Sequence, residues 1–146
     1  NNFNLKFIKT SGIINRETTN WICNKITNFI KKNNIKLFKK KILILGVAYK
    51  QNIDDTRESP ALKIAEKMKS HGYDFEYSDP YVKRIKFGKG FKKSKTVNSK
   101  LLKKYKIVLI VTDHTKFNYN IISKEAKYIF DARNVIKKRK KNYFKF

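Results

Sequence analysis

The chain has 146 residues, which fits one domain with a modest core or one domain with an appendage. Hydrophobic residues make up 40% of it, which argues against general disorder, and apolar runs such as Ile107–Val111 are too short to span a bilayer. The formal net charge of +25 makes nucleic-acid binding one hypothesis. However, 31 of the 36 basic residues are lysines spread along the chain, so we favour a compositional bias.

The first third of the chain has a helical pattern. Apolar residues recur at spacings of three, four and seven between Ile14 and Ile30. Ser11 as an N-cap and the Asn33-Asn34 pair as an end predict a helix over about residues 11–33, roughly 35 Å long. Such a length is typical of a connecting or interface helix. We therefore separate residues 1–38 from an α/β domain at residues 39–146.

After Phe38, predicted strands and helices alternate. The strands are Lys41–Leu45, Tyr73–Tyr77, Ile107–Thr112 and Tyr128–Asp131. The first helix starts at Ser59-Pro60, with Ser59 as its N-cap, and ends at His71-Gly72; two short helices follow at Ser99–Tyr105 and Asn120–Ala126. The basic stretch Val82–Thr96 is predicted to be an exposed loop. The alternation predicts an α/β fold, a Rossmann-like parallel sheet with flanking helices, preceded by the long helix.

Ligands of such sheets bind beyond the carboxyl ends of the strands, so the loop Gly46–Glu58 is the candidate site. It lacks the Gly-x-Gly-x-x-Gly pattern of a dinucleotide site, because Gly46 is its only glycine. Lys50 and Arg57 could instead bind phosphate, together with the helix N-terminus behind Ser59. A solvated loop with internal ion pairs explains the same residues, and the residue types alone leave both interpretations open.

The string Gly46–Ala61, GVAYKQNIDDTRESPA, resembles the signature of the carboxy-terminal domain of the UDP-glucose/GDP-mannose dehydrogenase family. In that family a strand is followed by an aromatic-Lys pair, an acidic stretch and Arg-Glu-Ser-Pro. Further motifs occur in the matching order: Ile14-Asn15, Asp79-Pro80-Tyr81, Thr112-Asp113-His114 and Asp131-Ala132-Arg133-Asn134. Tyr49 beside Lys50, with Pro80-Tyr81-Val82, is most similar to the members that oxidise UDP-N-acetylhexosamines.

The resemblance implies a role for each motif residue. Tyr49, Lys50 and Arg133 would contact the UDP-sugar, either a UDP-N-acetylhexosamine or UDP-glucose. Arg57 would reach the pyrophosphate of NAD or the neighbouring domain. The supporting residues would be Asp55, Glu58, Ser59, Asp79 and His114. For His114 we favour a structural hydrogen bond over direct contact with the ligand, and no metal site is implied.

The implied reaction oxidises the sugar C6 alcohol to a uronic acid with reduction of two NAD, for polysaccharide precursors. It needs an NAD-binding domain and a nucleophilic cysteine, neither of which is recognisable here. Cys23 lies on the long helix and is expected to pack rather than react, so no catalytic residue is expected in this chain. A single cysteine and no signal-peptide pattern favour a cytoplasmic location.

The resemblance further implies that the chain begins inside the family's central, dimerising helical domain and runs to the natural end. Activity would then need an amino-terminal NAD-binding half, in cis or in trans, and a homodimer through the long helix. Two alternatives stay open: a basic nucleic-acid-binding α/β module that uses the KKRKK run Lys137–Lys141, and a catalytically inactive partner copy. The mixed charges at positions 50–60 argue against the first alternative.

Overall fold

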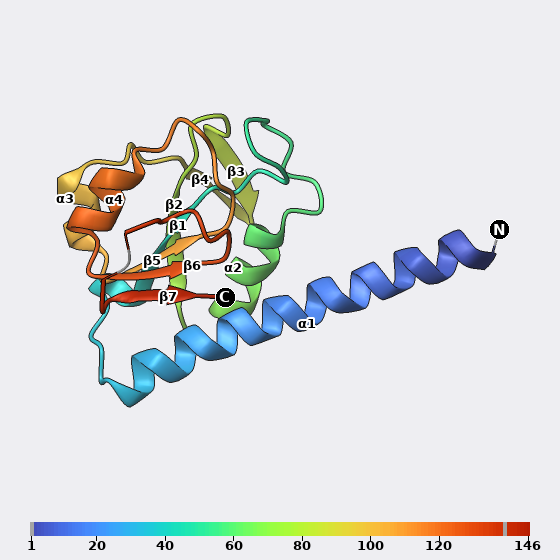
Figure 1. Ribbon diagram of the computed structural model, residues 1–146, viewed down its shortest axis with the longest axis horizontal. Helices are drawn as coiled ribbons and strands as arrows, with labels where there is room; N and C mark the ends of the chain where they lie inside the picture. The colour runs from blue at the N-terminus through green and yellow to red at the C-terminus, as the bar shows by residue number, and fades with distance from the viewer. Residues whose placement is uncertain (1, 139) are drawn as a thin grey trace.

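The computed structural model describes residues 2–138 and 140–146, with side chains from Arg16 onward. Arg139, in the middle of the basic run, lies outside the described residues, as do the side chains of Ser11, Ile14 and Asn15. Five parallel strands form one sheet in the order β2-β1-β5-β6-β7 (Figure 1). The strands are β1 (Lys41–Leu45), β2 (Asp74–Ser78), β5 (Ile107–Ile110), β6 (Tyr128–Asp131) and β7 (Tyr143–Lys145). The α/β fold is therefore confirmed.

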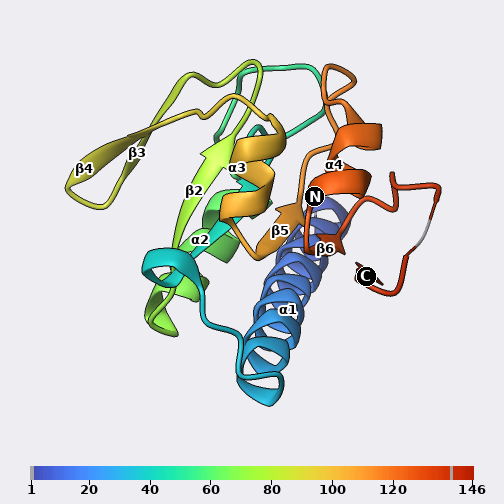
Figure 2. The ribbon, with the colours of Figure 1, turned by 90° about the vertical axis from the view of Figure 1, so that its left-hand side faces the viewer.

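Helices cover both faces of the sheet. On one face lie α1 (Asn2–Lys32) and α2 (Pro60–Ser70), and on the other lie α3 (Ser99–Lys104) and α4 (Tyr119–Glu125), which face the viewer in Figure 2. Successive residues of β1 alternate between the two cores: Ile42 and Ile44 join the α1/α2 side, while Leu43 and Leu45 join the α3/α4 side. Burial on both faces explains why β1 is continuously apolar.

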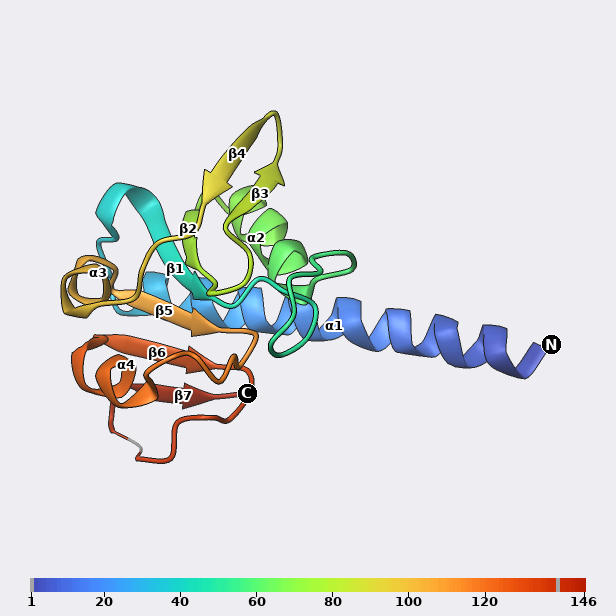
Figure 3. The ribbon, with the colours of Figure 1, turned by 90° about the horizontal axis from the view of Figure 1, so that it is seen from above.

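The long helix α1 starts earlier than expected. It runs from Asn2, not from about Ser11, so the predicted N-cap is wrong. Its end is as predicted, because Asn34 adopts a left-handed φ of +48° just after Lys32. The second half of α1 packs on the domain, whereas the first half extends beyond it (Figure 3). A short 3-10 helix, η1 (Phe38–Lys40), then leads into β1.

The stretch Val82–Thr96 is a hairpin, not an irregular loop. Strands β3 (Arg84–Phe87) and β4 (Gly90–Lys93) pair antiparallel, and the hairpin projects from the body of the domain (Figures 2 and 3). Gly88, the first residue of its two-residue turn, has a φ of +62°, as a type II′ turn requires. The predicted loop is therefore wrong. Ile85 and Phe87 point toward the core, but basic residues alternate with them, so the alternating apolar pattern of a strand is hard to see in the sequence.

Strand β7 has no counterpart among the predicted elements. It pairs with β6 in parallel register, and the ring of Phe144 stacks on Phe130 with centroids 4.8 Å apart. Among the described residues, no helix is long and apolar enough to cross a membrane.

Candidate functional site

An open cavity of about 620 Å³ lies at the carboxyl ends of β1, β5 and β6. The structure brings all three predicted substrate-contacting residues to it, since Tyr49, Lys50 and Arg133 line its wall. Its other lining residues are Gln51, Pro60, Val111 and Thr112. Three loops that are far apart in the sequence therefore meet at one site, where a parallel sheet is expected to bind its ligand.

Gly46 lets the loop after β1 approach the end of β5. Its φ is +81°, and a Cβ at this position would lie 2.3 Å from the carbonyl oxygen of Thr112. Thr112 also donates its hydroxyl to the carbonyl of Ala48 at 2.7 Å. The start of the loop is thus held against the cavity wall formed by Thr112.

Asp79 anchors the same loop from the end of β2. Its side chain is fully buried, and Oδ2 accepts the amide hydrogens of Val47 at 2.8 Å and Ala48 at 3.1 Å. Oδ1 accepts those of Tyr81 at 2.8 Å and Val82 at 3.1 Å. One carboxylate therefore fixes the loops after β1 and β2 together, and these amide hydrogen bonds offset the cost of burying its charge.

His114 completes this network and does not line the cavity. Its side chain is fully buried, and Nδ1 accepts the amide hydrogen of Asn52 at 2.9 Å. The proton must then be on Nε2, which donates to Asp79 Oδ2 at 2.8 Å. The neutral ring thus connects two loops through its two hydrogen bonds, which is a structural role.

The acidic stretch of the loop forms ion pairs at the surface. Arg57 donates from Nε and Nη2 to the carboxylate of Asp55, with the shortest contact, 2.8 Å, between Nη2 and Oδ2. The hydrogen bonds from Arg57 lower the pKa of Asp55 to about 2. The carbonyl of Asp55 accepts the amide hydrogen of Tyr49 at 2.7 Å, while Glu58 pairs with Lys63 at 2.9 Å. Arg57 does not line the cavity: its side chain is 88% exposed and stands outside it.

Ser59 supports the loop in a different way from the one predicted. It is not a side-chain N-cap of α2; its buried hydroxyl donates to the carbonyl of Val47 at 2.7 Å. Ser59 therefore occupies the predicted N-cap position before Pro60, but its hydroxyl is oriented toward the loop and makes no capping hydrogen bond with α2.

Arg133 is positioned by the buried carboxylate of Asp131, which belongs to the same motif but was given no role in the sequence analysis. Asp131, at the end of β6, accepts the amide hydrogen of Arg133 at 2.9 Å and the Tyr143 hydroxyl at 2.9 Å. It also accepts two further amides of the loop, from Val135 and Ile136. The guanidinium of Arg133 then donates from Nε to Asp113 at 3.1 Å. Gln51, Thr112 and Asp113 were likewise not assigned roles, although each is a polar residue just beyond a strand end.

The cationic groups of the cavity differ in their surroundings. Lys50 has no ion pair with any described carboxylate, and its Nζ lies 5.7 Å from the centroid of the exposed Tyr49 ring. Arg133 shares its charge with Asp113 and is half exposed. The site can therefore attract an anion at Lys50 and offer the fork of Arg133 to two oxygens.

Cys23 lies in the α1/α2 core, and its Sγ is 3.6 Å from the carbonyl oxygen of Ile64. Burial raises the pKa of this thiol to about 11, so the predicted packing role is confirmed. Among the side chains that the structure describes, from Arg16 to Lys138 and from Lys140 to Phe146, no three of His, Cys, Asp or Glu gather as ligands for a metal ion.

The comparisons with known proteins agree on one family. A family model described as "UDP-glucose/GDP-mannose dehydrogenase family, UDP binding domain" matches residues 43–138. The UDP-N-acetyl-D-mannosamine dehydrogenase of Methanococcus vannielii is 29% identical over 141 residues, covering 91% of this chain and 31% of that protein. The UDP-N-acetyl-D-mannosamine dehydrogenase of Pyrococcus horikoshii is 32% identical over 135 residues, covering 89% of this chain and 30% of that protein.

Solved structures give the same result. The native UDP-N-acetyl-mannosamine dehydrogenase of Staphylococcus aureus superposes with a TM-score of 0.71 and 28% identity. The alignment covers 97% of this chain and 34% of that one. The chain thus spans about a third of the length of the relatives it matches.

Proposed function

The chain belongs to the UDP-glucose/GDP-mannose dehydrogenase family, and we propose that it is the nucleotide-sugar-binding part of an NAD-dependent UDP-sugar 6-dehydrogenase. The complete enzyme would oxidise the C6 alcohol of the sugar to a uronic acid for polysaccharide precursors. That change removes four electrons, which matches two NAD accepting one hydride each. The observation that carries the proposal is the meeting of Tyr49, Lys50 and Arg133 at one cavity.

The cavity offers complementary groups to a nucleoside diphosphate sugar. Lys50, which has no described carboxylate partner, supplies a point charge for the diphosphate. Arg133 can donate to two oxygens at once, because Asp113 occupies only its Nε. The exposed ring of Tyr49 gives a flat surface for the base or the sugar. The start of α2 at Pro60 adds the positive end of an 11-residue helix.

The Asp79–His114 network prepares this cavity before ligand arrives. It fixes the amides of Val47, Ala48 and Asn52, on both sides of Lys50. A loop that is already ordered loses less entropy on binding, so more of the interaction free energy appears as affinity. The network thus contributes to substrate binding although it lies outside the cavity.

The residues present fit a peripheral contact to NAD, not a complete NAD site. Arg57 is the candidate, because Asp55 holds its Nε and Nη2 while Nη1 makes no hydrogen bond with a described residue and faces solvent. When bound, NAD would supply the hydride acceptor. Within this chain, Arg57 would bind the pyrophosphate or the adjoining domain, and the remaining NAD contacts would come from an amino-terminal half.

The substrate best supported is UDP-N-acetylmannosamine, because the relatives from Methanococcus vannielii and Pyrococcus horikoshii are named for it. A homodimer through α1 is supported by the half of that helix that extends beyond the domain (Figure 3) and by Trp21, which is 50% exposed.

A reconstitution assay tests the enzyme proposal. The chain is mixed with the amino-terminal NAD-binding part of a relative, and NADH formation is followed with UDP-N-acetylmannosamine. We expect two NADH per sugar, dependent on both polypeptides. The carboxy-terminal third of the same relative is the positive control. If that control restores activity while this chain, folded, restores none, the chain is an inactive copy and the proposal is wrong.

A further inference from the structure

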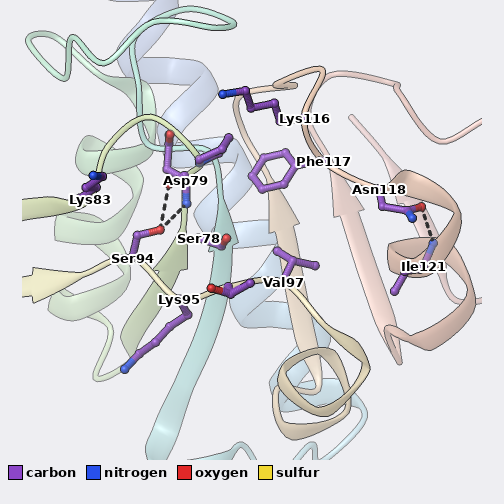
Figure 4. A pocket seen from close by; sticks show the side chains of 12 residues that line it. Ser78, Asp79, Lys83, Ser94, Lys95, Val97, Lys116, Phe117, Asn118 and Ile121 are labelled. Atoms are coloured by element: carbon purple, nitrogen blue, oxygen red, sulfur yellow. Dashed lines mark hydrogen bonds between the residues drawn. The ribbon is translucent and has the colours of Figure 1, made fainter.

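A second cavity, of about 410 Å³, lies beyond Asp79 and shares no lining residue with the cavity described above. It is bounded by the end of β2, the base of the β3–β4 hairpin and the segment that leads into α4 (Figure 4). Its volume falls within the range of small-molecule sites, about 300 to 1,000 Å³. The cavity lies outside the proposed UDP-sugar site, to which Asp79 connects it through the amides of Val47 and Ala48.

Ser78, the last residue of β2, places an unpartnered hydroxyl at this cavity. The residue is only 4% exposed, yet its hydroxyl makes no hydrogen bond with any described residue. Neighbouring Ser94 differs, because its hydroxyl accepts the amide hydrogen of Asp79 at 2.8 Å and donates to the Asp79 carbonyl at 2.9 Å. Figure 4 shows the two bonds between Ser94 and Asp79. The hydroxyl oxygen of Ser78 is not sealed in the interior but borders the cavity, so it is free to form a hydrogen bond with a ligand bound there.

The cavity also carries positive charge that nothing in its lining neutralises. Lys83, Lys95 and Lys116 lie at its rim, and none of them forms an ion pair with a described carboxylate. Asp79 is the one acidic residue among the lining residues described, and its two oxygens are occupied by four backbone amides and His114. Flexible lysines suit a dianionic phosphate group, which accepts from any direction.

The remaining wall is apolar. Val97, the largely buried ring of Phe117 and Ile121 line the side opposite Ser78, as Figure 4 shows. A free inorganic anion would leave this wall without contacts, whereas a ligand with a planar or apolar body would cover it. We propose that the second cavity binds a small phosphorylated molecule with such a body, of the nucleoside monophosphate class.

The probe for this site is AMP, titrated into the whole chain by isothermal calorimetry at low ionic strength. We expect Ser78→Val, which fills the cavity from β2, and the triple variant Lys83→Ala/Lys95→Ala/Lys116→Ala each to weaken binding at least tenfold. Ser78→Ala keeps the fold, because the lost hydroxyl has no protein partner, and should weaken binding by a smaller factor. Lys50→Ala, in the other cavity, should leave AMP affinity unchanged.

Four results would overturn the assignment. The site is excluded if the folded protein does not bind AMP. It is also excluded if neither Ser78→Val nor the triple lysine variant changes the affinity for AMP. Binding lost in Lys50→Ala places AMP in the UDP-sugar cavity instead. Inorganic phosphate that binds as tightly as AMP shows that the apolar wall takes no part. The two cavities share no lining residue. If AMP does not bind, the proposed UDP-sugar function is therefore unaffected. If UDP-sugar does not bind, the AMP proposal is equally unaffected.

Discussion

Asp79 and His114 form a fully buried pair, with His114 Nε2 lying 2.8 Å from Asp79 Oδ2, that connects the ends of β2 and β5. The other ring nitrogen of His114 accepts the amide hydrogen of Asn52 in the loop that carries Lys50. The order of the proposed substrate loop therefore depends on a residue that does not touch the cavity.

Removing this ring should destabilise the protein. His114→Ala leaves a cavity and one unsatisfied bond of the buried Asp79, and it removes the acceptor of the Asn52 amide, so the free energy of unfolding should fall by about 2–4 kcal/mol. Urea denaturation measures this loss in the free energy of unfolding. His71→Ala is the matched control, because the side chain of His71 has one described hydrogen-bond partner, the hydroxyl of Thr27, and the residue is partly exposed. An equal loss in both variants would contradict the structural role of His114.

Alanine substitutions at two glycines with positive φ, Gly72 and Gly46, distinguish the cost of backbone strain from the cost of a steric clash. Gly72→Ala, at a φ of +86° with nothing near its Cβ position, should lower the free energy of unfolding by about 1–2 kcal/mol. Gly46→Ala has a similar φ but would also press against the backbone of Thr112, so its cost should exceed that of Gly72→Ala by about 1–3 kcal/mol. Urea denaturation of the two variants compares them, and similar losses would show that β1 and β5 do not approach so closely.

Cys23 should be chemically inert in the folded protein. The thiol is buried, and its pKa is raised to about 11, so almost no thiolate is present at pH 8. Iodoacetamide labelling followed by mass spectrometry should be at least about a hundredfold slower in buffer than in urea. Rapid labelling of the folded chain would show that α1 leaves the domain readily.

The carboxyl group of Asp55 should lose its proton at an unusually low pH, because Arg57 holds its pKa down. The carboxyl signal of Asp55, followed by NMR, should have a midpoint near a pKa of about 2. Because this pKa is depressed, the pair stabilises the loop above the ordinary pKa of 3.8, and that contribution is lost as the pH falls toward 2. Arg57→Gln should raise the midpoint, whereas Arg133→Ala should not. An unchanged midpoint in Arg57→Gln would show that the ion pair does not form in solution.

The sequence predicted the strands that are buried on both faces, because Ile42–Leu45 and Ile107–Ile110 are continuous apolar runs. The sequence did not predict the β3–β4 hairpin, because basic residues interrupt its apolar pattern. It did not predict β7 either, because the ring of Phe144 finds its partner, Phe130, only when the end of the chain returns to the edge of the sheet. Helix α1 also began earlier than its capping signal indicated.

For the site, the resemblance pointed to Tyr49, Lys50 and Arg133, and the topology brought them together. It did not reveal that Asp131 holds Arg133 in place, or that the hydroxyl of the N-cap residue Ser59 donates to the carbonyl of Val47 instead of accepting an amide hydrogen of α2. Such contacts join residues that are distant in sequence or depend on the direction of one hydroxyl, and neither property has a local sequence signal.

An NMR titration with UDP-N-acetylmannosamine tests the central claim most directly, because it detects weak binding in the chain alone. The account predicts chemical-shift changes at the amides of Tyr49, Lys50, Thr112 and Arg133. Each of Lys50→Ala and Arg133→Ala should weaken binding about tenfold, the loss of one charge-assisted hydrogen bond. Lys100→Ala, an exposed lysine on α3, should bind like the unaltered chain. No shifts in a folded sample, or equal affinity in Lys50→Ala and Lys100→Ala, would contradict the account.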